Sequence, residues 1–318
     1  TGIPVLGVVP YFYLDIDEED SLTERFRRKK NAGLVDLAAV RLPRISNFTD
    51  FAPLASLEEV SVRYITSPDQ FGSPDAVLIP GSKNTIRDLL WMRQNGMEAK
   101  ILQFADRGGV VFGICGGYQM LGQEISDPDG TEQRGTVAGM GLLPVRTVVQ
   151  QEKRRTRVEG NFLALEGALK DLSGAPFAGY EIHMGKSALT EGGRALASIS
   201  EENVQSGIPG DLIPGEGIPV DGVPVEDSTG RTHPDGACRG NVYGCYVHGI
   251  FDAPEAAGGF LSALLKKKGC GPSEIRARDW KAYKEEQYDR LADIIRRSVD
   301  MEAVYRIIEK GNDAPCIL

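Results

Sequence analysis

The sequence lacks long apolar runs and lacks an excess of basic residues. No stretch approaches 18 consecutive apolar residues, so we expect no transmembrane helix. Acidic residues outnumber basic ones by 45 to 36, which gives a formal net charge of −9. This charge argues against a protein that binds nucleic acid or an anionic membrane surface. The chain also begins without a secretory signal pattern, and we expect a cytoplasmic protein.

Cysteine and histidine are both scarce. The five cysteines are scattered and odd in number, which is typical of a reducing compartment rather than of a disulfide framework. The only three histidines are His183, His233 and His248. An enzyme with a cysteine nucleophile usually pairs it with a histidine base. Any such base in this chain must therefore be one of these three side chains.

The first part of the chain alternates between apolar runs and helix-like segments. This alternation predicts an α/β fold with a largely parallel central sheet, whose ligands would bind at the carboxyl ends of the strands. Thr49 or Asp50 can cap the first helix, and Asn84 or Thr85 the second. The expected strands are residues 2–10, 35–42, 60–66, 75–79 and 110–114, and the expected helices are residues 49–57, 86–94, 98–106 and 118–125.

After Asp127 the pattern changes to strands without regular helices between them, and three helices end the chain. Residues 201–236 are rich in Gly, Pro, Asp and Glu and show little periodicity, so we expect a long mobile loop there. Residues 161–172 are ambiguous between helix and loop. The expected strands are residues 136–149, 154–159, 177–184 and 241–251, and the expected helices are residues 254–268, 279–298 and 301–310.

The stretch Gly113-Ile114-Cys115-Gly116-Gly117 has the features of a nucleophile elbow, a sharp turn between a strand and a helix. Such a turn strains the backbone, so the residues that flank the nucleophile must be small. The turn also places Cys115 at a helix N-terminus, where free N–H groups and the helix dipole favour a thiolate. The alternative is a buried structural cysteine in a glycine-rich turn.

Position alone does not decide which histidine serves Cys115. His248 ends an apolar strand-like run and is favoured; His183 also lies near a strand end, and His233 lies in the expected loop. A zinc site that combines His233, Cys238, Cys245 and His248 is disfavoured. The separation of Cys245 and His248 is odd, so they would face opposite sides of one strand, and the spacing matches no paired-ligand pattern. We therefore expect no metal site.

Several motifs together resemble the class I glutamine amidotransferases and, more narrowly, the glutaminase half of cobyric acid synthases. The elbow with a distant histidine carries the broader resemblance. The narrower one spans nearly the whole chain, because the motifs follow one another in the family's order. They are LPRISNFTD (42–50), PGSKNT (80–85), GICGGYQMLG (113–122), GYEIHMG (179–185), YVHGIF (246–251) and QYDRLAD (287–293).

The resemblance implies a flavodoxin-like α/β domain and a role for each matching residue. Cys115 would attack the side-chain amide of glutamine, giving a thioester and ammonia. His248 would protonate the leaving ammonia and activate the hydrolytic water. Backbone N–H groups of Gly116 and of the Gly81-Ser82 turn would form the oxyanion hole.

The resemblance leaves open which residue orients His248. Many amidotransferases of this class carry a glutamate two residues after the catalytic histidine, but this position is Ile250 here. Glu181 is a candidate for the orienting residue, and His183 is a further candidate for an orienting or substrate-binding residue.

The chain has no Gly-x-x-x-x-Gly-Lys-Ser/Thr phosphate-binding loop. The resemblance therefore implies that an ATP-dependent synthetase part lies upstream of residue 1. That part would use ATP, magnesium and the released ammonia to amidate the b, d, e and g carboxylates of a corrinoid acid in cobalamin biosynthesis. We expect glutamine as the substrate of the present chain, with no bound cofactor. The expected domains are a synthetase remnant with linker at residues 1–32, the glutaminase at 33–268 and a helical extension at 269–318.

Two other functions stay open. The amidase part of cobyrinic acid a,c-diamide synthase shares the elbow, although the Ser-Asn-Phe-Thr-Asp and Glu-Ile-His-Met-Gly stretches favour cobyric acid synthase. A non-catalytic, amidotransferase-like binding module is the second alternative. An altered nucleophile would have marked such a module, whereas Cys115 is intact.

Overall fold

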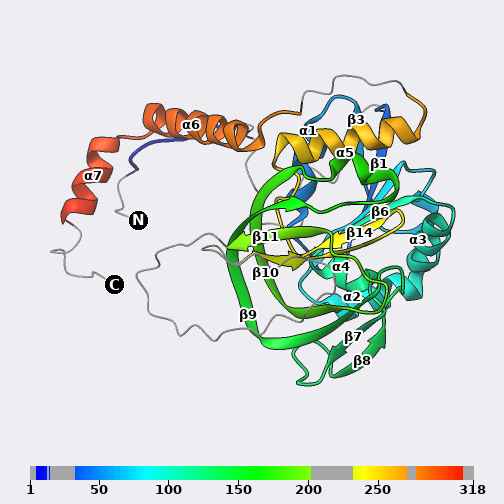
Figure 1. Ribbon diagram of the computed structural model, residues 1–318. Helices are drawn as coiled ribbons and strands as arrows, with labels where there is room; N and C mark the ends of the chain where they lie inside the picture. The colour runs from blue at the N-terminus through cyan, green and yellow to red at the C-terminus, as the bar shows by residue number, and fades with distance from the viewer. Residues whose placement is uncertain (1–4, 13, 15–32, 202–231, 271–276, 311–318) are drawn as a thin grey trace. The chain divides into compact units, whose positions relative to one another are not determined.

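The computed structural model describes residues 5–12, 14, 33–201, 232–270 and 277–310 (Figure 1). Most of the expected loop at 201–236 lies outside the described residues. The chain divides into two compact units, one comprising residues 19–278 and the other residues 1–18 together with 279–318.

The larger unit is built on a six-stranded sheet of the predicted α/β type. Five strands are parallel, and the short edge strand β13 is antiparallel to β14. β4 and β6 are buried along their whole length, as expected for central strands that are covered on both faces. The order across the sheet is β13 (Ala237–Arg239), β14 (Val242–Cys245), β6 (Val110–Ile114), β4 (Ala76–Ile79), β1 (Val35–Val40) and β3 (Val60–Ile65).

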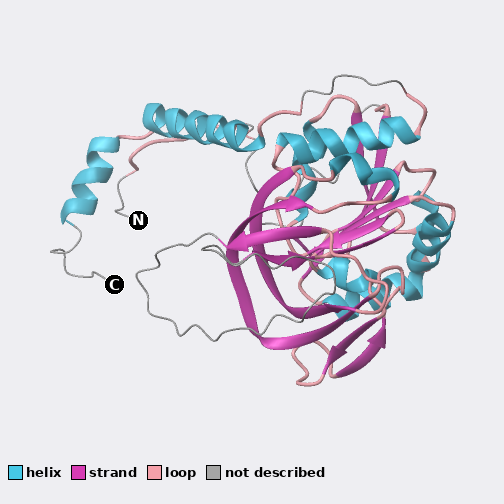
Figure 2. Cartoon of the chain, in the orientation of Figure 1, coloured by secondary structure: helices cyan, strands magenta, loops and turns pink. Residues whose placement is uncertain are grey.

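Helices flank this sheet (Figure 2). Their ends follow local sequence signals: the Asn84 side chain accepts a hydrogen bond from the Arg87 N–H at 3.0 Å, and Gly96 ends the same helix with φ +83°. The helices are α1 (Ala52–Ser56), α2 (Thr85–Asn95), α3 (Met97–Asp106), α4 (Gly116–Leu121) and α5 (Pro254–Lys267), and the 3₁₀ helices are η2 (Phe48–Phe51), η3 (Pro68–Gln70) and η4 (Gly167–Leu172).

A second, mostly antiparallel sheet holds the β-rich middle of the chain. Its centre is a long hairpin-like pair, β9 and β10, which Figure 1 shows curving beside the central sheet. The strands are β7 (Glu124–Asp127), β8 (Gly135–Ala138), β9 (Val145–Phe162), β10 (Pro176–Leu189), β11 (Ala197–Glu201) and β12 (Thr232–Asp235). Two further strands, β2 (Ile45–Ser46) and β5 (Gly81–Ser82), pair only with each other.

Several boundaries differ from those predicted. α4 ends at Leu121 because Gly122 is extended, and residues 124–127 form β7 instead of continuing the helix. The two strands expected at 136–149 and 154–159 are β8 and one continuous strand, β9. The strand expected at 241–251 ends at Cys245, and residues 232–235 of the expected loop are strand β12.

The smaller unit contains the two predicted C-terminal helices, α6 (Trp280–Ser298) and α7 (Met301–Lys310). Asp279 caps α6 by accepting a hydrogen bond from the Ala282 N–H at 3.0 Å. Of the strand expected at 2–10, the described part forms one antiparallel bridge, between Gly7 and Val299. Across the described residues, no helix is both long enough and apolar enough to span a membrane.

Candidate active site

Cys115 occupies the strained turn between β6 and α4. Its backbone has φ +52° and ψ −109°, and among the described residues only Asn47 is another non-glycine with positive φ. A non-glycine residue in this region costs free energy and persists only where the surrounding structure enforces it. The neighbouring glycines are enforced by packing: a Cβ on Gly113 would lie 2.7 Å from the Gly117 carbonyl, and one on Gly117 would overlap the Ile79 carbonyl oxygen. The predicted elbow is therefore present.

Substitution of Gly117 by alanine should lower the free energy of unfolding by about 1–3 kcal/mol or more, because the new methyl group overlaps rigid backbone atoms of β4. Chemical denaturation measures the effect. Gly259→Ala is the matched control, since its Cβ would meet only the movable Leu172 side chain, at 3.2 Å, inside α5. Equal stability of Gly117→Ala and wild type would show that the elbow has more room than the structure gives it.

His248 is the histidine that the fold brings to Cys115. It lies three residues beyond β14, the strand paired in parallel with β6, and the Cys115 N–H donates to the Cys245 carbonyl at 2.8 Å. Burial lowers the pKa of His248, but the Asp50 carboxylate and the Cys115 side chain both raise it, with a net value of about 10. The charged, imidazolium form of the ring is therefore favoured beside the Cys115 side chain.

Asp50 orients His248. Its Oδ2 lies 2.7 Å from His248 Nδ1, and its Oδ1 accepts the Gly249 N–H at 3.0 Å. Both side chains are buried, with exposed fractions of 3% and 1%. Because Asp50 holds Nδ1, the other ring nitrogen, Nε2, is left to face Cys115. The three side chains form a Cys–His–Asp arrangement whose members come from η2, the elbow and the segment after β14.

This position of Asp50 differs from the one expected from the sequence. Asp50 or Thr49 is expected to cap a helix, but the structure shows no side-chain cap on η2 or α1. The signal was present, since Asp50 ends the Ser-Asn-Phe-Thr-Asp motif. What the sequence could not supply was the left-handed turn at Asn47, with φ +51°, after which Asp50 faces His248 across 198 residues of sequence.

Strand β10 holds the other side of His248. The Tyr180 N–H donates to the His248 carbonyl at 3.1 Å, and the His248 N–H donates to the Tyr180 carbonyl at 2.8 Å. The Tyr180 ring stacks on the imidazole with 5.3 Å between centroids, and Asn47 Nδ2 donates to the Tyr180 hydroxyl at 2.7 Å. Gly179 has no room for a side chain, because a Cβ there would overlap the His248 carbonyl oxygen. The imidazole is thus fixed from two directions.

Backbone amides border the cysteine on the side of β5. Gly116 is the first residue of α4, where the N–H has no acceptor within the helix. A Cβ on Gly116 would lie 2.9 Å from the Ser82 backbone nitrogen, and one on Gly81 would lie 3.3 Å from His248 Cε1. Gly81, Ser82 and Gly116, the three predicted oxyanion-hole residues, therefore lie together beside Cys115 and His248.

A sequence profile of the CobB/CobQ-like glutamine amidotransferase domain matches residues 36–256, which include all of these site residues. This chain belongs to that family. The amidotransferase match covers the central sheet, the elbow and the segment that carries His248.

Curated relatives of this amidotransferase chain are longer than it is. The cobyric acid synthase of Ruminiclostridium cellulolyticum is 47% identical over 97% of this chain and 56% of the relative. That of Lachnoclostridium phytofermentans is 42% identical over 98% of this chain and 57% of the relative. The chain thus spans about half the length of the curated relatives it matches.

Among solved structures, PurLQS from Thermotoga maritima aligns over 74% of this chain and 99% of the matched chain, with 14% identity and a TM-score of 0.48.

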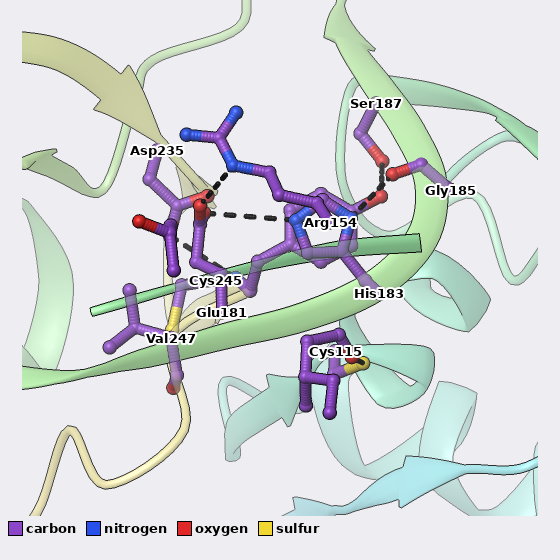
Figure 3. Close-up of polar contacts among 12 residues, drawn as sticks. Cys115, Arg154, Glu181, His183, Gly185, Ser187, Asp235, Cys245 and Val247 are labelled. Carbon is purple, nitrogen blue, oxygen red and sulfur yellow. Dashed lines mark hydrogen bonds and ion pairs between the residues drawn. The ribbon is translucent and has the colours of Figure 1, made fainter. Parts of the chain in front are cut away.

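Glu181 and His183 of the amidotransferase lie in a polar cluster around Arg154, which Figure 3 shows together with Cys115; the Cys115 thiol contacts the carbonyl of the intervening Ile182 at 3.7 Å. Glu181 pairs with Arg154 at 2.8 Å, and His183 Nε2 lies 3.9 Å from the Glu181 carboxylate. His183 is also held by the Gly185 carbonyl, 2.7 Å from Nδ1, and its ring stacks on Tyr246. The contacts given for Glu181 are in this cluster, and the position proposed for it, beside His248, is taken by Asp50.

The buried carboxylates of this cluster, Glu181 and Asp235, share one cation, the Arg154 guanidinium. Burial raises the pKa of Glu181, but His183 and Arg154 outweigh it, and the net pKa is lowered. Burial and the nearby Glu181 charge raise the pKa of Asp235 to about 7. His233 lies 3.3 Å from Arg154, so His183 and His233 both lie in this cluster.

The four residues of the disfavoured zinc site do not point to a common position. The Cys238 thiol contacts the Ala195 carbonyl, whereas the Cys245 thiol contacts the Val247 carbonyl. Within the part of the chain that the structure describes, no group of three or more His, Cys, Asp or Glu side chains is placed to hold a metal ion.

Proposed function

We propose that this chain is the glutaminase portion of a cobyric acid synthase and that it hydrolyses glutamine through a thioester on Cys115. The observation that carries the proposal is the contact of His248 with both Cys115 and Asp50, at the carboxyl ends of two neighbouring parallel strands. The family match and the relatives named cobyric acid synthase support it.

The geometry supports a two-step reaction. Cys115 attacks as the thiolate of a thiolate–imidazolium pair: its Sγ bonds to the side-chain carbonyl carbon of glutamine, and His248 donates its proton to the leaving nitrogen, which departs as ammonia. The neutral His248 then takes a proton from water as that water attacks the thioester, which releases glutamate and restores the thiolate–imidazolium pair. Asp50 holds the ring in one orientation and stabilises its charged form. The N–H groups of Gly116 and of the Gly81-Ser82 strand bind the oxyanion in both steps.

The ammonia would serve a synthetase part that this chain does not include. We propose that this part holds ATP and magnesium and amidates the b, d, e and g carboxylates of a corrinoid acid. Residues 33–268 would form the glutaminase, 1–32 the end of the synthetase part with its linker, and 269–318 a helical extension. The bridge between Gly7 and Val299 supports an association of the first and third of these segments.

The test is to assay the purified chain with glutamine, ATP, magnesium and a corrinoid acid. We expect weak glutamate production, no ATP turnover, and amidation only when the synthetase part is supplied. ATP-dependent amide formation by the 318-residue chain alone would contradict the division of labour. Failure to produce glutamate even with the synthetase part would favour a non-catalytic module, and amidation of the a and c carboxylates would favour the diamide synthase.

A further inference from the structure

We infer that Asp88 is a positioning residue of the glutaminase reaction, because its carboxylate fixes the short strand that presents the Ser82 N–H to the reacting carbonyl. This inference rests on the function proposed above. Asp88 does not contact Cys115 or His248 in the contacts that the structure gives it, and it is separate from the Cys–His–Asp arrangement.

The Asp88 side chain is completely buried in the first turn of α2, yet its carboxylate is well satisfied. Oδ2 accepts the Ser82 hydroxyl at 2.7 Å and the Arg44 N–H at 3.1 Å. Oδ1 accepts from Arg44 Nη1, also at 3.1 Å. Burial raises the pKa of Asp88, and these hydrogen bonds oppose that rise. One carboxylate therefore binds two segments that are 38 residues apart in the sequence.

Those two segments form the smallest ladder of the fold. Arg44 directly precedes β2, and Ser82 ends β5, so the carboxylate grips both strands at the same end. The Lys83 N–H donates to the Arg44 carbonyl at 2.8 Å, and the Asn84 N–H donates to the Ser82 hydroxyl at 3.0 Å. A ladder of two residues per strand has few hydrogen bonds of its own to hold it in place. The Asp88 carboxylate supplies the fixed point on helix α2.

The position of this ladder matters because its other side faces Gly116 and His248. The Ser82 nitrogen is the atom that a Cβ on Gly116 would meet, and Gly81 lies against the ring of His248. An oxyanion donor is effective only if its N–H points to where the negative charge develops, at about 2.7–3.1 Å. A carboxylate that sets the angle of the Ser82 peptide therefore acts on the rate of the chemical step rather than on the binding of glutamine.

The experiment compares glutamine hydrolysis with alkylation of Cys115 by iodoacetamide in the 318-residue chain. Alkylation needs the thiol of Cys115 and the imidazole of His248 but builds no oxyanion. For Asp88→Asn we expect kcat for glutamine to fall by roughly 10- to 100-fold, somewhat less than the loss of a whole oxyanion donor, with KM nearly unchanged. Ser82→Ala, which keeps the backbone N–H but loses the 2.7 Å bond, should show a smaller fall in kcat. The alkylation rate should stay at the wild-type value in both.

The matched control is Glu98→Gln, which removes the charge of another buried carboxylate; Glu98 on α3 forms an ion pair with Arg93 of α2 at 2.6 Å. It should lower stability without changing kcat. If Asp88→Asn folds and keeps the wild-type kcat, the inference is wrong. If Asp88→Asn does not fold, a wild-type kcat in Ser82→Ala would overturn the inference instead. So would a parallel loss of alkylation, since that would place the effect on the nucleophile. Absence of glutamate production and of Cys115 alkylation in the wild-type chain would instead refute the proposed function.

Discussion

Replacement of Cys115 by alanine should reduce glutamine hydrolysis by roughly three orders of magnitude or more, because removal of the nucleophile from a catalytic triad has effects of that size. The measurement is glutamate production at saturating glutamine. The variant should remain folded, since alanine is no larger than cysteine and the positive φ of this position is already adopted by a non-glycine residue.

Two other cysteines provide the controls. Cys270 is exposed, and Cys245 is fully buried with a pKa raised well above the usual value, chiefly by desolvation. Alanine at either position should leave hydrolysis nearly intact. A chloroketone analogue of glutamine should accordingly label Cys115. Labelling mainly at Cys245 would be incompatible with the assigned nucleophile.

Substitution of Asp50 by asparagine should lower kcat by roughly 10³- to 10⁴-fold, the size of effect seen when the aspartate of a Ser–His–Asp triad is replaced and the histidine takes the wrong tautomer. The neutral amide removes the charge that raises the pKa of His248. The pKa of His248 should therefore fall, and less of the imidazolium that protonates the leaving ammonia should be present near neutral pH. Glutamate production across a pH series measures this loss.

The same substitution should change how stability depends on pH. The folded-state pKa of His248, about 10, lies above its ordinary value of 6.5, so its contribution to stability is complete below pH 6.5 and is lost as the pH rises toward 10. Urea denaturation at several pH values should show that decline in the wild type and a weaker one in Asp50→Asn. Glu181→Gln is the comparison for activity: if it lost activity and Asp50→Asn did not, the orienting residue would be Glu181.

Local chemistry made much of the site predictable. A strand that ends in Gly-Ile-Cys-Gly-Gly has few structural outcomes, and the packing around Gly113 and Gly117 shows why glycine is required there. The same holds for the α/β alternation and for the Asn84 and Gly96 helix ends, which are decided within a few residues. His248 was the favoured base for the related reason that parallel strands end at one edge of the sheet.

The contacts of Asp50 and Asp88 could not be predicted, because their partners lie far away in the sequence. Each is a single carboxylate near a helix start, where a capping role is the usual reading. Asp50 acts on His248, 198 residues away, and Asp88 acts on Arg44, 44 residues away. The sequence predicts two strands in place of the single long strand β9 for a different reason. The central residues of β9 are mostly exposed and charged, so apolar alternation is lost there while pairing with β10 continues.

The pairing of Tyr180 with His248 also constrains the length of the chain, not only its composition. Gly179 must face the His248 carbonyl, and a Cβ on Gly185 would overlap the amide of Gln119. Residues 179–183 pair in regular register with β9, before the irregularity between His183 and Gly185, so a shift of this part by one residue would turn each side chain to the opposite face of the strand and bring Glu181 or Gly179 against the imidazole in place of Tyr180. Residues 179–185 are therefore fixed at both ends, by His248 at Tyr180 and by Gln119 of α4 at Gly185, and the number of residues between these contacts is set by the structure.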